Sequence, residues 1–579
     1  MWVKLLLLFF VLSFLLRTDN SFNQDLGRHL KLGEIILQTG QIPKSNLFSY
    51  TNPDYPFINT HWLFEVLIYG IDQTINLQWM LIFKVIIFLL SVWLIFKTIP
   101  KQNQVLLLPI GFIFLHVLRE RLELRPEIFS FLFTAITYYI LERFLRGPTK
   151  LIYLMPLVQL IWINTHIYFF VGLILQAVFL IHLTYQNLRS HIGSGKLKLL
   201  GIILGLSVLV SLVNPNGLTG LLFPFNVTKN YGYTIVENQT MNLLESINFR
   251  DPNFLFVKLT VAIILFSITI AILSSLRKQG SNKKIDNMDS RLKNILLSLF
   301  GLVLALMHVR SFPYLVFLSL PATLLNFGAI PWNTPTRILT IVAAVLLLFE
   351  SFFYLNGDYY RFRDDSHKVG LGFEENVRGA MDFVLAHDLP QPIYNNFDIG
   401  SYLLYRGYPK YQVFVDGRPE AYPAQFFTGV YIPSQSDYNV HTLQEVNDYK
   451  NFKEIEKIYQ FKTIIFSHTD QTPWGRNFLQ NVVKDEGWKL VYIDDFTIVL
   501  VKDEEAKLKG LNGIDLSTLT PQAFNYKNHL SYLRITLFLL STGYTDSGRQ
   551  FIGKTLQIFP QSPIANLVIG NPTQNKFFW

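Results

Sequence analysis

Long apolar runs recur through the first 356 residues of this chain, and they limit the folds open to it more than any other feature. A helix needs roughly 20 apolar residues to cross the hydrocarbon core of a bilayer, and many of these runs approach that length. Half of the 579 residues are hydrophobic and only 16% are charged, which is too apolar for a soluble protein of this size. The sequence therefore predicts a polytopic α-helical membrane protein.

We expect about 11 transmembrane helices from the lengths of these runs. The predicted spans are residues 2–17, 78–97, 104–118, 127–144, 151–164, 167–186, 197–213, 256–276, 293–309, 311–327 and 337–356. The first run resembles a signal peptide, but no small-residue cleavage site follows it, so we interpret it as an uncleaved span. The run at 61–71 is too short to span and contains Glu65, so we expect it to lie at the interface or dip into it.

Basic loops predict the orientation of the chain. Lys and Arg gather in residues 97–102, 142–150, 189–198 and 277–293, and these loops share one side if 61–71 does not span. Because cytoplasmic loops carry the excess of Lys and Arg, we expect a multi-pass protein of the cell membrane. Its N-terminus would be cytoplasmic, and the segment after residue 357 would be extracytoplasmic. The net charge of +9 then reflects topology, and nucleic acid is not an expected partner.

The first predicted outer loop, residues 18–77, carries the clearest candidates for catalysis. A predicted helix ends at Gly40 and places Asp25 and His29 four residues apart, on one face. Asp25 either accepts a proton from an attacking hydroxyl as a general base or only pairs with a neighbouring cation. Asp19 is the rival base, since it is nearer the membrane. Cysteine is absent, which excludes thiol catalysis and disulfides.

Further ionisable and polar residues fall on the same predicted side. Arg119, Arg125 and Arg310 are candidates for binding a phosphate, because a guanidinium makes bidentate contacts with phosphate oxygens. Arg121 we interpret as part of a solvated face with Glu120 and Glu123. A buried Lys84, inside a predicted span, needs to snorkel or to find an ionic partner.

Histidine and amide side chains next to the spans have two interpretations. The residues in question are His61, Trp62, Asn164 and His166. They either hydrogen-bond a substrate or satisfy helix ends. A divalent metal on His29, His61 and His166 is a further possibility, although the spacing matches no standard site, and no other cofactor is predicted.

Composition changes at about residue 366, where charge rises and apolar runs shorten to strand length. Alternating helices and strands predict an α/β domain over 366–505, with a largely parallel sheet and an antiparallel final pair. Residues 412–417 are one predicted strand. Asp416 and Arg418 stand at its end, and they either bind substrate or form a turn and docking contact, which we favour.

Residues 515–570 look like one tetratricopeptide-type helical hairpin. A single unit of this kind cannot bury its own apolar face, so it must pack on another part of the chain or on a partner. The tail 571–579 is expected to fray.

Several short motifs have a common resemblance. They read "DLGRHLKLG", "GQIP", "FSYT" and "HWLFE" in the first loop, then "LRPE", "NTH", "NPNG" and a late Arg310, and finally "PIYNNFDIGSYLLYRG" and "VFVDGRPEAY". Together they resemble membrane glycosyltransferases of the GT-C superfold, in a bacterial set related to the dolichyl-phosphate-mannose protein mannosyltransferases. The adjacent Asp-Glu pair of the better-known members is missing here, because Leu26 follows Asp25.

The resemblance implies a GT-C-like transmembrane domain over residues 1–356 and transfer of a sugar at the outer face. The donor would be a sugar on a polyprenyl phosphate, and the acceptor a hydroxyl of an exported glycan or protein. Asp25 would be the base, assisted by His29, with inversion at the sugar. Two alternatives remain: a non-catalytic scaffold or lipid-handling subunit, and a transporter. We rank the transporter last because no broken helices pair in matching halves of the chain.

Overall fold

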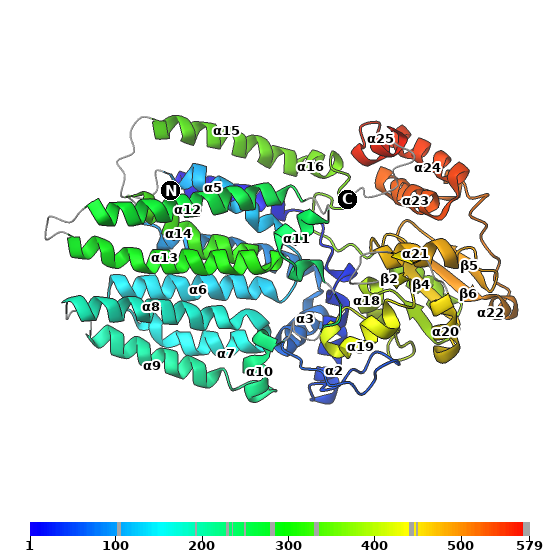
Figure 1. Ribbon diagram of the computed structural model, residues 1–579, viewed down its shortest axis with the longest axis horizontal. Helices are drawn as coiled ribbons and strands as arrows, with labels where there is room; N and C mark the ends of the chain where they lie inside the picture. Colours follow the sequence, from blue (N-terminus) through cyan, green and yellow to red (C-terminus); the bar gives the residue numbers. More distant parts are fainter. Residues whose placement is uncertain are drawn as a thin grey trace.

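The computed structural model describes residues 1–100, 106–190, 194–226, 231–233, 235–247, 251–277, 284–328, 335–438, 445–446 and 450–570. A bundle of long helices forms one end of the elongated molecule, and a small sheet with its helices forms the other (Figure 1). Helices α2 (Leu26–Thr39) and α3 (Trp62–Ile75) lie between the two parts.

Long apolar helices build the bundle. They are α1 (Trp2–Leu15), α4 (Gln78–Thr98), α5 (Leu107–His116), α6 (Glu127–Arg146), α7 (Met155–Thr165), α8 (Phe170–Ser190), α9 (Ser194–Val210), α12 (Asn253–Arg277), α13 (Lys284–Met307), α14 (Phe312–Phe327) and α15 (Pro335–Leu355). Within the described residues, five segments are long and apolar enough to cross a membrane: those of α4, α6, α8, α12 and α15. The crossing number of 11 stays a prediction, and parts of the basic loops at 97–102, 189–198 and 277–293 lie outside the described residues.

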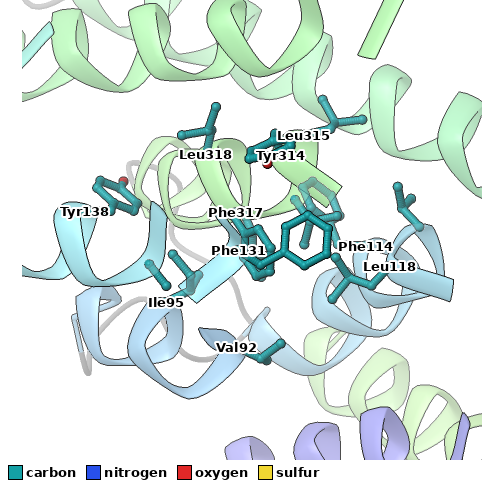
Figure 2. Packing of buried hydrophobic residues seen from close by; sticks show 14 of the residues in the cluster. Val92, Ile95, Phe114, Leu118, Phe131, Tyr138, Tyr314, Leu315, Phe317 and Leu318 are labelled. Atoms are coloured by element: carbon teal, nitrogen blue, oxygen red, sulfur yellow. The ribbon is translucent and has the colours of Figure 1, made fainter. Parts of the chain in front are cut away.

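Outer and inner helices of the bundle differ in what they expose. In the apolar part of α15 only 22% of the residues are buried, and Ile341 and Phe349 are 63% and 64% exposed. A large apolar surface of this kind marks contact with lipid. Helix α14 is buried almost throughout, and Figure 2 shows its Phe317 and Tyr314 packed on Phe131 of α6. Ring centroids of Phe131 lie 5.7 Å from Phe317 and 5.6 Å from Tyr314.

Short elements connect the bundle to the second part. These are η1 (Ser21–Asn23), η3 (Val117–Glu120), η5 (Ile167–Phe169), α10 (Gly217–Asn226), η7 (Val236–Asn238), α11 (Met241–Ser246), η8 (Val309–Ser311) and α16 (Asp358–Arg361). Helix α2 ends at Gly40 with a φ of 68°, as the sequence predicts. At Gly33 a Cβ atom would lie 2.1 Å from the backbone oxygen of Glu65, so glycine allows α2 and α3 to approach closely.

The sheet is mixed, with the order β1 (Ile393–Asn395), β4 (Thr463–Ser467), β6 (Thr497–Lys502), β5 (Trp488–Ile493). Only β1 and β4 are parallel; β4 pairs with β6, and β5 with β6, in antiparallel register. The expectation of a largely parallel sheet is therefore wrong, whereas the antiparallel final pair is confirmed. Strands β5 and β6 form a β-hairpin, and its second strand, β6, lies next to β4. Strand β6 therefore runs antiparallel to β4.

Residues 412–417 do not form the predicted strand. Val413 makes only an isolated bridge to Ser49, and its amide donates to the backbone oxygen of Phe48 at 3.0 Å. Phe414 and Val415 are fully buried, so the apolar run marks a core segment. It hydrogen-bonds to residues 48–51. Among the described residues, its hydrogen bonds to the sheet run through the side chain of Asn395, which donates to the Val415 oxygen and accepts from the Phe414 amide. A strand pattern alone does not identify the bonding partner.

Helices flank the sheet, and a helical hairpin closes the chain. The flanking elements are α17 (Arg378–Ala386), α18 (Phe397–Gly407), η9 (Pro419–Ala421), α19 (Ala424–Phe426), η10 (Phe427–Tyr431), α20 (Lys450–Tyr459), α21 (Pro473–Val482), α22 (Asp503–Leu508) and η11 (Pro521–Ala523), with a separate strand pair β2 (Asp437–Tyr438) and β3 (Glu445–Val446). The hairpin consists of α23 (His529–Thr542) and α24 (Thr545–Ile558), turning at Gly543, followed by α25 (Pro563–Gly570).

A buried carboxylate docks this hairpin on the segment that follows the bundle. Asp364 accepts hydrogen bonds from the Ser562 hydroxyl at 2.8 Å and the Ile564 amide at 2.9 Å, and contacts His529 Nε2 at 2.8 Å. The hairpin thus packs on the rest of the chain. The tail 571–579, expected to fray, lies outside the described residues.

Candidate functional site

A cavity of about 1560 Å³ lies between the end of the bundle and the sheet-containing part. Asp25, His61, Arg125 and Arg310, predicted from four separate stretches of sequence, all line it. Arg28, Tyr168, Glu237 and Asn238 complete the wall on the bundle side.

Asp25 stands at the start of α2 with its carboxylate between two guanidinium groups. Its Oδ1 accepts from Arg28 Nη2 at 3.1 Å and Nε at 3.2 Å, and its Oδ2 lies 3.7 Å from Arg125 Nη2. Burial alone would raise the pKa of Asp25, but the positive charges of Arg28 and Arg125 more than offset it and lower the pKa. Asp25 is therefore ionised at neutral pH and able to accept a proton.

Glu237, which the sequence analysis missed, is the second carboxylate of this wall. Both of its oxygens accept from Arg125 Nη1, at 2.7 and 2.9 Å, and Arg121 Nη1 lies 2.7 Å from Oε1. Burial alone would raise the pKa of Glu237. The positive charges of Arg121, Arg125 and Arg310 lower this pKa by more, so the net shift is downward. No local pattern in the sequence distinguishes this glutamate, because its partners come from distant segments.

Arg121 corrects an interpretation from the sequence. It is only 6% exposed, and its Nε and Nη2 donate to Glu127 at 2.7 and 3.0 Å. It is thus a buried support for Glu237 and Glu127 rather than part of a solvated face with Glu120 and Glu123. The turn after η3 points it inward, which residue spacing does not predict.

Arg310 lies in η8, between α13 and α14, and faces the cavity wall formed by η7. Its Nη1 donates to Asn238 Oδ1 at 2.9 Å, and its buried Nε has no hydrogen-bond partner among the described residues. The amide of Val309 also donates to the backbone oxygen of Gln239 at 3.0 Å, which fixes the two turns together. With Arg28 and Arg125, Arg310 makes this wall suited to an anion.

Arg119 does not line the cavity. It pairs with Glu350 Oε1 at 3.3 Å, bonds the Tyr354 hydroxyl, and lies over the ring of Phe256. These contacts tie η3 to α15 and α12, and they leave the proposed phosphate role of Arg119 without support from its position.

The rings of His29, His61 and His166 lie next to one another at the bundle wall. Ring centroids of His29 and His61 are 5.5 Å apart, as are those of His61 and His166. His29 Nδ1 lies 3.0 Å from Glu65 Oε1, and His166 Nδ1 lies 2.7 Å from Ser130 Oγ. Of the three, only His61 lines the cavity, and within the described residues no group of three or more His, Cys, Asp or Glu is placed to hold a metal ion.

Burial dominates the titration of this cluster. It raises the pKa of Glu65 to about 7, and, with the charge of Arg28, lowers the pKa of His61 to about 3. His61 is therefore neutral at physiological pH.

The side chains of Trp62 and Asn164 hydrogen-bond to each other and do not line the cavity. Trp62 Nε1 donates to Asn164 Oδ1 at 2.8 Å, and Asn164 Nδ2 donates to the backbone oxygens of Leu160 and Val213, both at 2.9 Å. The pair joins the start of α3 to the ends of α7 and α9, so its visible role is to hold the first outer loop on the bundle.

Asp416 and Arg418 form a fully buried ion pair just behind the cavity wall, which Gly417 between them lines. Arg418 Nε and Nη2 donate to the two oxygens of Asp416 at 2.7 Å each, and Nη2 also donates to Asn46 Oδ1 at 2.8 Å. Both side chains are 0% exposed, so they are not available to a substrate. The favoured interpretation, a turn and docking contact, describes this geometry: the pair fastens the C-terminal part to the first outer loop.

Asp19, the rival base, is also 0% exposed and does not line the cavity. Its Oδ2 accepts from Lys84 Nζ at 2.6 Å. This is the ionic partner that a buried lysine requires.

The rest of the cavity wall comes from two other sources. The C-terminal part contributes the acidic and polar residues Asp398, Glu420, Thr469, Asp470, Gln471 and Thr472. An apolar flank is formed by Phe223, Pro224 and Phe225 of α10, Phe300, Val303, Leu304 and Met307 of α13, and Ile564 and Leu567 of α25. Val303 and Met307 are 53% and 52% exposed, so this flank is continuous with the outer surface of the bundle.

No protein-family model matches the chain, and no curated protein sequence matches it. It is similar in structure to the archaeal oligosaccharyltransferase AglB from Archaeoglobus fulgidus, solved in complex with an inhibitory peptide and a dolichol-phosphate. The TM-score is 0.52 at 10% identity, over 84% of this chain and 71% of that one. The likeness shows that this chain has a GT-C fold.

Two other A. fulgidus oligosaccharyltransferase structures align less well. One is tethered to an acceptor peptide (TM-score 0.48, 10% identity, 87% of this chain and 74% of that one). The other is the apo form (TM-score 0.48, 11% identity, 83% and 71%). The fold assignment rests on the first structure alone.

Proposed function

We propose that this protein is a membrane glycosyltransferase, which moves a sugar from a polyprenyl-phosphate donor to an acceptor hydroxyl with inversion. The observation that carries the proposal is the placement of Asp25. It lies in a large cavity, 3.7 Å from Arg125 and on the same wall as Arg310, in a chain with a GT-C fold.

The basic wall and the apolar flank suit the two ends of such a donor. Arg125 and Arg310 would hold the phosphate, because guanidinium groups stabilise the charge that develops on a leaving phosphate. The isoprenoid chain would lie along the exposed apolar residues of α10 and α13, which continue onto the lipid-facing surface.

Asp25 would take the proton of the acceptor hydroxyl as its oxygen attacks the anomeric carbon of the sugar. The bond from that carbon to the phosphate oxygen breaks, and polyprenyl phosphate leaves with the electron pair. Two cations now neutralise Asp25, which makes it a weak base. A donor phosphate that attracts Arg125 would raise the proton affinity of Asp25 when the base is needed.

The acceptor would be an exported glycan or protein that meets the C-terminal wall of the cavity. In this arrangement residues 1–356 bind the donor, residues 366–505 form the acceptor side, and 515–570 close the cavity. A. fulgidus AglB, with the same fold, was solved with a peptide and a dolichol-phosphate, which supports the two classes of substrate.

The same proposal requires 11 spans, a cytoplasmic N-terminus and an extracytoplasmic C-terminal part. Because the chain has no cysteine, single cysteines placed at exposed positions report sidedness cleanly. A cysteine at Leu508 should react with an impermeant maleimide in intact cells, and one at Arg143 only after lysis. The reverse pattern would contradict the orientation.

Asp25→Asn tests the reaction itself. We expect the glycan product to fall by about 10²- to 10⁴-fold, the contribution typical of a general base, with unchanged protein level. Mass spectrometry of surface glycans from cells with the wild-type protein, the variant or no protein measures this. Glu34→Gln, at a half-buried position of the same helix that does not line the cavity, is the matched control. Glycans that are identical in all of these cells would favour the non-catalytic scaffold or lipid-handling subunit.

A further inference from the structure

Asp19 is the point where four segments of the chain meet. Its Oδ1 accepts from the Ser21 amide at 3.0 Å, and its Oδ2 accepts from both Lys84 Nζ at 2.6 Å and the Leu124 amide at 2.8 Å. Its own backbone pairs with Gly372 and Glu374, at 2.8 and 2.9 Å. The side chain is fully buried, so these contacts saturate it.

Two of these bonds lead directly to the cavity. The backbone oxygen of Ser21 accepts a hydrogen bond from the amide of Asp25 at 3.0 Å. Ser21 therefore links the Oδ1 of Asp19 to Asp25, the residue that precedes α2. Leu124 immediately precedes Arg125. One carboxylate therefore holds both backbone segments whose side chains, Asp25 and Arg125, lie 3.7 Å apart across the site.

A second buried carboxylate supports the same junction. Glu123 Oε2 accepts the amide of Asn20 at 2.7 Å, while Oε1 pairs with Arg17 at 2.7 Å and lies 3.1 Å from His367 Nε2. The strand-like stretch around residues 17–20 is thus fastened to residues 123–124 at two adjacent points. Such doubled contacts fix a relative position more firmly than one bond does.

We propose that Asp19 is a positioning residue, which sets the separation and orientation of Asp25 and Arg125 through the Ser21 and Leu124 amides. Lys84 has a different role: it is the buried counter-charge of the Asp19 carboxylate, 2.6 Å away. The alignment of Asp25 with Arg125 by Asp19 rests on these contacts alone, whereas the effect of this alignment on sugar transfer rests on the function proposed above.

The chemistry of asparagine separates the two roles. An amide has one acceptor oxygen, and its nitrogen is a donor. Asp19→Asn would satisfy the Ser21 or the Leu124 amide but would turn a donor toward the other, and it would leave Lys84 without a counter-charge. Adding Lys84→Met removes the unpaired charge and leaves only the loss of alignment.

The test therefore uses the full-length double variant Asp19→Asn/Lys84→Met. Its matched control is Glu142→Gln/Lys293→Met, which neutralises another buried ion pair of the bundle. Glu142 lies 15 residues along α6 from Glu127, or about 22 Å from the cavity end of that helix at 1.5 Å per residue.

Hydrogen–deuterium exchange gives a readout that does not depend on activity. We expect peptides covering residues 20–28 and 119–127 to exchange at least about tenfold faster in the double variant than in the control, in line with a local opening. Unchanged protection in both peptides would overturn the proposal.

Transfer kinetics supply the second readout. Misplacement of a catalytic group by about 1 Å can cost about 100-fold in rate, so we expect the double variant to lose transfer rate at saturating donor and the control to keep it. Full transfer with faster exchange would overturn the positioning role. If wild-type protein itself transfers no sugar, the proposed function fails, while the exchange result still decides the alignment.

Discussion

The two walls of the cavity differ in how their charged groups are paired. Arg28, Arg125 and Arg310 are the cations of the bundle side, and each is bonded to a carboxylate or an amide oxygen. The C-terminal side contributes Arg363 and Arg534, together with Asp398 and Glu420, two carboxylates for which no ion pair occurs among the described residues. The comparison teaches that the bundle wall holds its arginines in a fixed network, whereas the C-terminal wall leaves two carboxylates open to a ligand.

Titration supports this contrast between the walls. Burial raises the pKa of Glu420, whereas Asp398 is exposed. On the bundle side, arginines lower the pKa of Asp25 and Glu237 in spite of burial. The bundle wall therefore holds ionised carboxylates at neutral pH, and the pKa shift at Glu420 has the opposite direction.

The largest effect on this comparison is expected from Arg310→Lys. Lysine keeps the charge but loses the planar fork, and one lost hydrogen bond to a charged group costs about 1.5–3 kcal/mol. The KM for a polyprenyl-phosphate donor should rise about tenfold to 100-fold, measured with purified protein in lipid nanodiscs. Arg119→Lys is the control, since Arg119 lies outside the cavity. An equal rise in both variants would mean that the cavity wall does not bind the phosphate.

Asp398→Asn should sharpen the difference from the other side. We expect the KM for the acceptor to rise about threefold to tenfold, the worth of one hydrogen bond, while the KM for the donor stays the same. Steady-state kinetics with each substrate varied in turn separate the two constants. Asp546→Asn, at a position 91% exposed on the hairpin, serves as the control. A donor KM that rises instead would remove the distinction between the walls.

The smallest effect concerns stability, at Glu65 behind the bundle wall. Its pKa is raised from 4.5 to about 7, so between these values the folded protein holds a proton that the unfolded chain releases. Its contribution to stability therefore falls as pH rises from about 4.5 to about 7. In Glu65→Gln the melting midpoint should change with pH by a few degrees less over this range than in the wild type.

Melting of detergent-solubilised protein at pH 5 and pH 8 checks this expectation. Glu34→Gln, at a half-buried position of α2, should behave like the wild type. A melting midpoint that falls from pH 5 to pH 8 as much in Glu65→Gln as in the wild type would show that Glu65 does not titrate in this range.

Several features follow from local sequence alone. Helix α2 ends at Gly40, Lys84 has an ionic partner, and the final strands pair antiparallel, because glycine, a buried charge and a short hairpin act within their own surroundings. The GT-C fold was also readable, since its motifs lie in short contiguous stretches. That Asp25, His61, Arg125 and Arg310 line one cavity agrees with their predicted common side.

Other features depended on which distant segments came together. Sequence spacing assigned Arg121 to solvent, expected a strand at 412–417 and a largely parallel sheet, and gave no weight to Glu237. The structure decides each of these through partners far along the chain: Glu237 for Arg121, Phe48 for Val413, and β6 beside β4. The sequence favoured Asp25 as the base and kept Asp19 as its rival, and burial and bonding separate the two in the structure.

By itself, the sequence determined the helical membrane character, the GT-C fold and the residue types available for an anion and a base, because apolar length and short motifs are local properties. Tertiary structure alone decided which carboxylate is open to the cavity and which is a buried junction. The physical reason is that the ionisation and reach of a side chain depend on the charges and hydrogen bonds around it, and those come from segments that the linear order does not place together.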